Sequence, residues 1–317
     1  AVEDYLARLG LSDELRTHSP DFATLSDLLK AHLFSVPFEN LDQHEHPAAT
    51  GFDLVPRQWP TEDQKHIDLA RFLQKVVRGR GGFCFELNNC FAWLLRQLGF
   101  KVRTVSAQVH IGSLPATHIT LLVKCVDREG EVLVDVGFAD NPRVPVPLDG
   151  TEVSDPLGDT YRICGGDWDD PDTPRFNTQL QRSRGGPRSL DWARDIPPAE
   201  VPPGTWKYMF RFAPSEDLGI DDPDMAAGLT TVLTCPTNIF TQKRITCLAM
   251  PNGHVTLASN RIKRVENGHE TEEPLEGEAA WRVALRDIFH IAHTSGRSRV
   301  HEPSPSCAGW IPSIAFS

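Results

Sequence analysis

The sequence predicts an α+β protein with three successive parts: an N-terminal helical bundle, a central antiparallel β-barrel and a C-terminal α/β lid. Two observations support this fold class. Apolar residues recur at helical spacing in the first hundred residues, change to a period of two at Lys101, and change again near Asp221. The strand-like stretches that follow Lys101 are joined by short turns, which favours antiparallel pairing. We therefore predict the three parts at residues 1–97, 98–214 and 215–317.

The composition is that of an ordinary globular protein and limits its partners. The chain has 317 residues, of which 40% are hydrophobic and 24% charged. Its formal net charge of −11 disfavours nucleic acid and anionic membranes as partners, and no apolar run is long enough to cross a bilayer. Seven cysteines without a CxxC pair fit a reducing compartment and argue against disulfides or a zinc cluster. We predict a cytoplasmic monomer with no metal and no permanently bound cofactor.

The N-terminal part has three apolar stretches at helical spacing. The predicted helices cover Val2–Leu9, Asp21–Leu33 and Ile67–Val77. Pro37 forces the residue before it into an extended conformation, and we expect a loop over residues 38–40. A polar, Pro-rich loop is predicted from His44 to Glu62. It contains His44-Glu45-His46, the nearest approach to a metal motif, which we interpret as a solvated loop.

A fourth helix begins at a cysteine. Two glycines precede Cys84, and helical spacing then joins Leu87, Phe91, Leu94, Leu95 and Leu98. A helix N-terminus carries unpaired N–H groups and a partial positive charge, which favour a thiolate over a thiol. Gly81 and Gly82 allow a tight turn and the close approach of a ligand. These features suit a nucleophile, although a buried cysteine at the start of a core helix is the commoner arrangement.

The next predicted strands bring two further residues toward Cys84. Strands are predicted at residues 101–110, 117–126 and 131–136, with a turn at 127–130 between the last two. Antiparallel pairing would bring His118 and Asp135 side by side, and a helix N-terminus facing them would supply Cys84. Nucleophile, base and orienter of the base then form a cysteine-protease-like Cys-His-Asp site.

Fewer sequence signals are available for the part of the chain that follows these strands. A stretch at about residues 164–204, dense in Asp, Arg, Gly and Pro, is interpreted as a surface insertion. Beyond it we expect a strand, a hairpin turning at Pro251-Asn252-Gly253, a further strand, a helix, and a tail that packs back onto the body. Their ranges are Trp206–Phe212, Gln242–Ala249 paired with Val255–Ser259, Arg261–Val265, Glu278–Ile291 and Ser295–Ser317.

Four segments resemble the arylamine N-acetyltransferases, and the Pro-rich inserts and the long tail are similar to those of eukaryotic, fungal members. The four segments are VPFENL at 36–41, RGGFCFELN at 80–88, THITLLV at 117–123 and LVDVGFAD at 133–140. The resemblance implies that Cys84, His118 and Asp135 are catalytic. It also implies that Glu39 pairs with Arg80 to hold the cysteine loop, although Glu39 alone could be a surface acid. The further support residues that it implies are Asn40 and Asn88.

The resemblance also implies the substrates. Acetyl-CoA or malonyl-CoA would be the co-substrate, and an arylamine or hydrazine would receive the acyl group. The implied substrate pocket contains Phe38, Phe138, Leu114 and Pro115, and the implied acyl-CoA contacts are Met250 and Gly253. Two departures concern the acyl group: Ala139 replaces the usual glycine, and Leu114-Pro115 stands where small residues are usual. Pro115 has no N–H to donate to an oxyanion.

Several functions fit this site. The resemblance implies a ping-pong acyl-CoA-dependent N-acyltransferase that works through an acyl-cysteine. One alternative is an arylamine N-malonyltransferase that prefers malonyl-CoA. A cysteine hydrolase or transglutaminase-like enzyme would use the same three residues, and a non-catalytic relative would keep them for structure.

Overall fold

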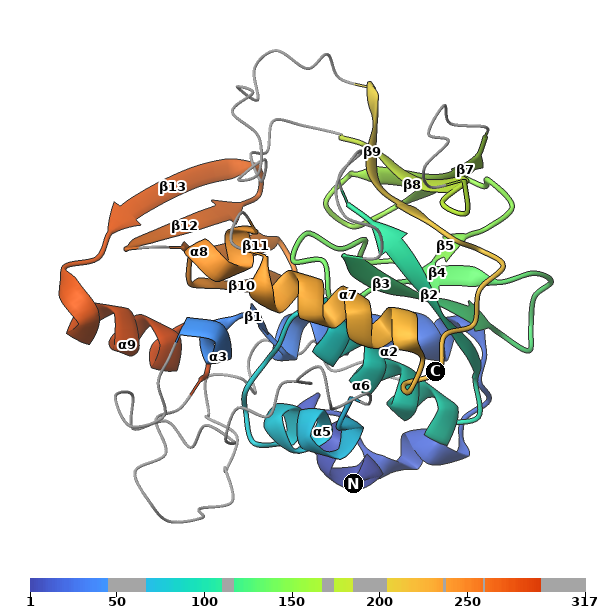
Figure 1. Cartoon of the computed structure of the whole chain (residues 1–317), viewed down its shortest axis with the longest axis horizontal. Helices are drawn as coiled ribbons and strands as arrows, with labels where there is room; N and C mark the ends of the chain where they lie inside the picture. Colours follow the sequence, from blue (N-terminus) through green and yellow to red (C-terminus); the bar gives the residue numbers. More distant parts are fainter. Residues whose placement is uncertain are drawn as a thin grey trace.

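A computed structural model describes residues 1–44, 67–109, 117–166, 174–184, 204–235, 238–258 and 260–291. The described residues form two antiparallel sheets and a group of helices, as the α+β prediction requires. One sheet has eight strands in the order β5-β4-β3-β2-β9-β8-β7-β6, and the other has five in the order β1-β10-β11-β12-β13. Figure 1 shows the two sheets side by side, with α2, α5 and α6 beneath them and α7 running between them.

The N-terminal helices lie close to their predicted ranges. They are α1 (Val2–Arg8), α2 (Phe22–Ser35), α5 (Leu69–Val77) and α6 (Cys84–Gln97), with a 3₁₀ helix at Asp13–Thr17 and a short α3 at Leu41–His44. Helix α2 begins where the Asp21 side chain accepts a hydrogen bond from Thr24 N, 2.8 Å away. It ends at Val36, which is extended ahead of Pro37. His44 closes α3 rather than opening a loop, and the remainder of the predicted 44–62 loop lies outside the described residues.

Helix α6 is the centre of the helical part. Every residue from Cys84 to Ala92 is buried, and the helix packs against α5 on one side and against β2 and β3 on the other. Its apolar residues form one continuous core with α1, α2 and the inner strands. A helix enclosed in this way holds its first residue rigidly relative to the neighbouring strands.

The eight-stranded sheet curls into an almost closed barrel, because β5 lies beside β7 near the two ends of the sheet. Its strands are β2 (Lys101–Gln108), β3 (His118–Lys124), β4 (Val132–Val134), β5 (Val146–Pro147), β6 (Val153–Ser154), β7 (Thr160–Gly165), β8 (Thr178–Ser183) and β9 (Trp206–Phe212). The pairing of Leu121 with Val134 places the start of β3 beside the residues that follow β4. The predicted antiparallel barrel is therefore confirmed.

The predicted surface insertion at 164–204 is wrong over part of its length. Residues Thr178–Ser183 form β8, which pairs with β7 and β9, and Leu180 is completely buried. The sequence of β8 is mostly polar and lies between Gly- and Pro-rich stretches, so it carries only one apolar residue as a signal. Residues 167–173 and 185–203 of the predicted insertion lie outside the described residues.

In the C-terminal part, the described residues form three helices and four strands of the second sheet. They are α7 (Pro223–Thr234), α8 (Ile239–Gln242), β10 (Ile245–Met250), β11 (Gly253–Ala258), β12 (Arg261–Glu266), β13 (His269–Pro274) and α9 (Gly277–Asp287). The hairpin at Pro251-Asn252-Gly253 is confirmed. Strand β13 and helix α7 were not predicted; β13 is exposed at every position, so it has no apolar alternation. The tail from residue 292 lies outside the described residues.

The stretch after Pro37 is a strand and not the predicted loop. Phe38 and Glu39 form β1, which pairs with Cys247 and Thr246 of β10, and Phe38 also bridges to Gly82. The second sheet therefore begins with a strand from the N-terminal part. This strand lies directly beside the turn that leads to Cys84.

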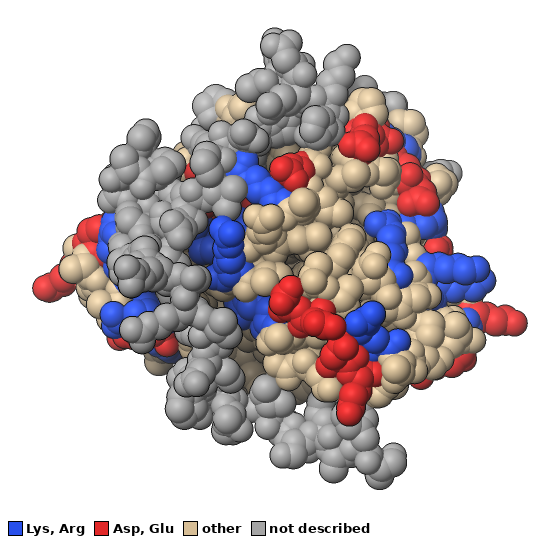
Figure 2. Space-filling view, turned by 90° about the horizontal axis from the view of Figure 1, so that it is seen from below, with Lys and Arg blue, Asp and Glu red and all other residues tan. Residues whose placement is uncertain are grey.

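The described surface carries charges of both signs. On the face shown in Figure 2, Lys and Arg side chains are interspersed with Asp and Glu among the other residues. Within the described part of the chain, no helix combines the length and apolar character needed to span a membrane.

Candidate functional site

Cys84 is the first residue of α6, as predicted, and it is almost completely buried. Its Sγ lies 3.9 Å from the carbonyl oxygen of Thr117, just ahead of β3. The two preceding glycines are required by space. A Cβ on Gly81 would overlap the carbonyl group of Pro37, and one on Gly82 would lie 2.6 Å from Glu86 Oε2. The close packing of this turn on β1 and α6 directs the cysteine toward β3.

His118 joins Cys84 to Asp135. Its Nε2 lies 2.6 Å from Asp135 Oδ2, and its ring also shares a hydrogen bond with the Cys84 side chain. Because Nε2 faces the carboxylate, Nδ1 is the ring nitrogen left for the thiol. Burial opposes the charged imidazole, but the Asp135 carboxylate and the contacts with Cys84 outweigh it and raise the pKa of His118 to about 10. The predicted juxtaposition of the three residues is therefore confirmed.

Asp135 is held by groups from α6 and from its own turn. Its Oδ1 accepts hydrogen bonds from Asn88 Nδ2 at 3.0 Å and from Gly137 N at 2.8 Å, which leaves Oδ2 for His118. Asn88 also donates to the carbonyl oxygen of Ile119 at 2.7 Å and accepts from Val136 N at 3.0 Å. The predicted support residue Asn88 thus connects the cysteine helix to β3, which carries His118, and to the turn after β4, which carries Asp135.

Two aromatic rings lie against His118. Phe138, half-buried, has its ring centroid 5.5 Å from the imidazole, and the buried Phe210 of β9 lies at 5.0 Å. Phe138 was predicted beside the site, but Phe210 was not. The alternation of Trp206–Phe212 predicts that Phe210 faces inward, but nothing in its spacing connects it to His118. Ala139, which follows Phe138, adopts a left-handed φ of 70°, the conformation that glycine adopts most easily.

The other predicted pocket residues lie in different surroundings. Phe38 is 5% exposed and packs in the core against the partly exposed ring of Phe240, with the ring centroids 5.7 Å apart. Phe240 also approaches Phe83, beside the cysteine, and was not predicted. Leu114 and Pro115 lie outside the described residues. The pocket assignment therefore stays a prediction.

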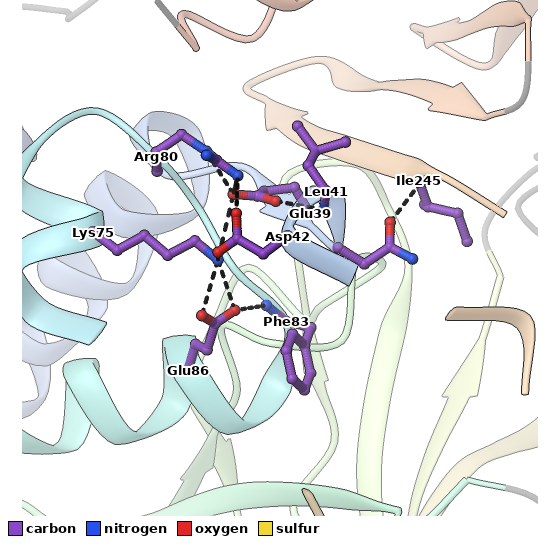
Figure 3. A network of polar contacts seen from close by, with 9 residues as sticks. Glu39, Leu41, Asp42, Lys75, Arg80, Phe83, Glu86 and Ile245 are labelled. Atoms are coloured by element: carbon purple, nitrogen blue, oxygen red, sulfur yellow. Dashed lines mark hydrogen bonds and ion pairs between the residues drawn. The ribbon is translucent and has the colours of Figure 1, made fainter. Parts of the chain in front are cut away.

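The predicted pair of Glu39 and Arg80 is confirmed and belongs to a larger network (Figure 3). Arg80 Nε lies 3.0 Å from Glu39 Oε1, and the Glu39 side chain is completely buried, so the surface-acid interpretation is wrong. Arg80 also contacts Asp42 at 2.8 Å. Lys75 in turn contacts Asp42 at 2.9 Å and Glu86 at 2.9 Å. Lys75, Arg78 and Arg80 flank the turn before Cys84 in the sequence, which by itself leaves open whether they form a solvated face or lie beside the thiol or the cofactor. The sequence does not point to Asp42 or Glu86.

Asn40 connects the cysteine-bearing part to the second sheet. Its Oδ1 accepts from Ile245 N at 2.8 Å, and its Nδ2 donates to the carbonyl oxygens of Phe240 and Lys243 at 2.9 and 2.8 Å. His44 adds a contact of 2.7 Å between its Nε2 and the Phe240 oxygen. Glu45 and His46 lie outside the described residues, and the described part of the chain holds no group of three His, Cys, Asp or Glu suited to a metal ion.

Met250 and Gly253 lie at the turn between β10 and β11. A Cβ on Gly253 would overlap the carbonyl of Val265 on β12, and the Gly253 carbonyl accepts a hydrogen bond from Arg143. Packing within the protein therefore accounts for glycine at this position. The predicted acyl-CoA contact of the two residues stays a prediction.

Comparison with known proteins identifies a family and several relatives. A family model described as N-acetyltransferase matches residues 21–296. The arylamine N-acetyltransferase of Escherichia coli is 27% identical over 280 residues, which cover 86% of this chain and 82% of the relative. That of Mycolicibacterium smegmatis is 34% identical over 169 residues, which cover 50% of this chain and 54% of the relative.

A solved structure shows the same fold. The Mycobacterium marinum arylamine N-acetyltransferase in complex with CoA has a TM-score of 0.69 at 24% identity, over 92% of this chain and 93% of that one.

Proposed function

This chain belongs to the arylamine N-acetyltransferase family, and from this premise we propose that it moves the acetyl group of acetyl-CoA to an arylamine or hydrazine through an acyl-cysteine at Cys84. The observation that supports the proposal most directly is the buried contact chain from Cys84 through His118 to Asp135 at the start of α6. Acetyl-CoA would be a dissociable co-substrate of a cytoplasmic monomer.

In the first half-reaction, the Cys84 thiolate attacks the thioester carbon of acetyl-CoA. The new carbon–sulfur bond forms as the carbonyl electrons move to oxygen, and backbone N–H groups at the start of α6 stabilise this oxyanion. The oxyanion collapses, the bond to the CoA sulfur breaks, and the leaving thiolate takes a proton from the His118 imidazolium. The raised pKa of His118 supports this step, because it keeps the imidazole protonated at neutral pH.

In the second half-reaction, the amine nitrogen attacks the acyl-cysteine. His118, now neutral, accepts the proton that the amine loses, and the bond between the acyl carbon and Cys84 Sγ breaks. The product leaves and the thiolate–imidazolium pair is restored. Asp135 stabilises the imidazolium and fixes the ring orientation, while Asn88 and Gly137 hold the carboxylate.

For the amine we propose a site beside Phe138, whose partly exposed ring lies against His118. A flat aromatic amine would contact such a ring, and an aromatic contact contributes about 0.5–1.5 kcal/mol beyond area burial. Phe38, Leu114 and Pro115 are proposed as further contacts of the substrates, and Met250 and Gly253 as contacts of acyl-CoA.

The test follows the acyl group. Incubation with acetyl-CoA alone should add one acetyl group to the peptide that contains Cys84, detected by mass spectrometry, and an arylamine should then remove it with N-acetylarylamine as the product. Cys84→Ala should carry no acetyl group and form no product. Product formation by Cys84→Ala within about tenfold of the wild-type rate, about 1.4 kcal/mol in barrier, would contradict the proposal.

The same assay separates the alternatives. Loss of the acetyl group to water without N-acetylated product would indicate a cysteine hydrolase. A higher kcat/KM with malonyl-CoA than with acetyl-CoA would indicate an N-malonyltransferase, and a panel of acyl-CoAs against one arylamine measures this ratio.

A further inference from the structure

Five charged side chains are packed together behind the turn that carries Cys84 (Figure 3). They come from β1, α3, α5, the loop before α6, and α6 itself: Glu39, Asp42, Lys75, Arg80 and Glu86. Four of the five residues are less than 9% exposed, and the Asp42 side chain is 18% exposed. We call this group the charge cluster.

We propose that Lys75 and Glu86 are positioning residues for the cysteine: they hold the turn that presents the thiol and set the net charge behind it. The inference rests on the proposed function only in taking Cys84 as the nucleophile. Neither residue touches the three reacting side chains, so both would act through the backbone and through charge.

The backbone argument begins at Glu86. Its Oε2 accepts a hydrogen bond of 3.2 Å from Phe83 N, the amide directly before Cys84. Lys75 Nζ donates to both oxygens of the same carboxylate, at 2.9 and 3.0 Å, and so fixes the orientation of the acceptor.

Backbone hydrogen bonds also hold Gly82, the residue before Phe83. Gly82 O accepts a hydrogen bond from Glu39 N at 2.8 Å, and Gly82 N donates to Pro37 O at 3.3 Å. The peptide groups that lead into the nucleophile are thus bonded to the charge cluster and to β1.

The charge argument follows from the numbers of acidic and basic side chains in the charge cluster. Three carboxylates face two cations, so the charge cluster carries one excess negative charge when all five groups are ionised. Burial raises the pKa of Glu86 to about 7, together with repulsion from Asp42 and Glu39 and against the attraction of Lys75. The groups that face Glu86 are therefore Lys75 on α5, Asp42 on α3, Glu39 on β1 and the Cys90 thiol on α6.

The negative charge lies two residues from Cys84, at the end of the helix that favours a thiolate. A like charge at that distance opposes formation of the thiolate, whereas the ammonium of Lys75 compensates for it. Lys75 therefore offsets the negative charge of Glu86 behind the cysteine, and protonation of Glu86 removes that charge.

The test measures alkylation of Cys84 by iodoacetamide against pH, with the alkylated peptide identified by mass spectrometry. Lys75→Met removes the cation that favours the ionised form of Glu86, so this carboxyl takes up a proton and the midpoint of the profile should move little. Its kcat for arylamine acetylation should fall by roughly tenfold to a hundredfold because the turn loosens, with KM for acetyl-CoA unchanged. Glu86→Gln keeps an acceptor for Phe83 N but removes the charge, so its midpoint should move down.

The double variant Lys75→Met/Glu86→Gln restores the wild-type balance of one excess negative charge, and its midpoint should return toward that of the wild type. Lys124→Met, which removes an exposed cation from β3, is the matched control and should leave the profile unchanged. A wild-type midpoint in Glu86→Gln, or a wild-type kcat in folded Lys75→Met, would overturn the proposal. If Lys75→Met does not fold, Glu86→Gln and the double variant give the same decision.

The experiments distinguish a failure of the proposed function from a failure of the proposal about Lys75 and Glu86. A wild-type enzyme whose Cys84 is not acetylated by acetyl-CoA would overturn the proposed function, but the alkylation profiles would still decide whether the charge cluster controls the thiol.

Discussion

At the scale of single residues, the site depends on one glycine that the cysteine touches. A Cβ at Gly137 would lie 2.5 Å from Cys84 Cα and 3.0 Å from Asn88 Nδ2. Real Cβ atoms do not approach so closely, and the Cα of a buried helix cannot move aside without moving the helix. The Gly137 amide also donates to Asp135, so a displaced turn would carry the carboxylate away from His118.

We expect Gly137→Ala to lower kcat/KM by about a hundredfold, because the reacting groups separate by a fraction of an ångström to an ångström. Overpacking should also reduce the free energy of unfolding by about 1–3 kcal/mol. The measurements are steady-state kinetics and urea unfolding. Gly165→Ala is the control, since a Cβ there meets no atom within 4 Å and its φ is not in the left-handed region. Activity of Gly137→Ala equal to that of the control would contradict this account.

At the scale of elements, α6 organises the site through neighbouring asparagines that point in different directions. Asn88 bonds Asp135, Ile119 and Val136, whereas Asn89 bonds the carbonyl oxygen of Phe85 and the sulfur of Met225. Both are buried on the same helix, so they differ in what they connect and not in their exposure. Comparing variants of the two asparagines therefore separates the effect of losing a buried amide from the effect of losing a bond to the catalytic site.

We expect Asn88→Ala and Asn89→Ala to lose similar stability, about 1–3 kcal/mol each, because each leaves buried polar groups without a partner. Only Asn88→Ala should also lower kcat sharply and weaken the pH dependence of Cys84 alkylation, because it releases Asp135. Chemical unfolding and single-turnover acylation measure the two effects. Equal losses of activity in both variants would remove Asn88 from the support of Asp135.

At the scale of the whole molecule, the cysteine-bearing part and the second sheet are built into each other. Strand β1 is the edge of that sheet, and the Asn40 side chain makes three hydrogen bonds to the segment from Phe240 to Ile245. Phe240 from this segment packs on Phe38 and Phe83, beside the turn before Cys84. The division at residues 97 and 214 stays a prediction, but these contacts mean that the first and last parts share structure.

We expect Asn40→Ala to speed amide hydrogen exchange in both the 239–250 segment and the turn at residues 81–83, because one set of bonds orders both. Asn238→Ala, which removes only the side-chain cap at Phe240 N, should speed exchange at α8 alone. Exchange measured by mass spectrometry on peptides from the two regions tests this. Unchanged exchange at residues 81–83 in Asn40→Ala would show that the two regions are ordered independently.

Local patterns in the sequence were enough for the α+β class, the helix that begins at Cys84, the barrel strands with His118 and Asp135, and the hairpin at Asn252-Gly253. Each of these depends on near neighbours in the chain: apolar spacing, a cap, or a turn residue. The pairing of Glu39 with Arg80 came from the family resemblance, since no local pattern connects residues so far apart.

Other features were decided only by tertiary structure. Strands β1 and β8 carry almost no apolar pattern, and each exists because a longer strand beside it pairs with its backbone. Phe210 reaches His118 because the barrel curls, and Lys75, Asp42 and Glu86 meet because three separate helices converge on one buried point. A charge in the sequence looks the same whether water or another charge surrounds it. Packing determines which of the two it meets, and with it whether the group ionises near neutral pH.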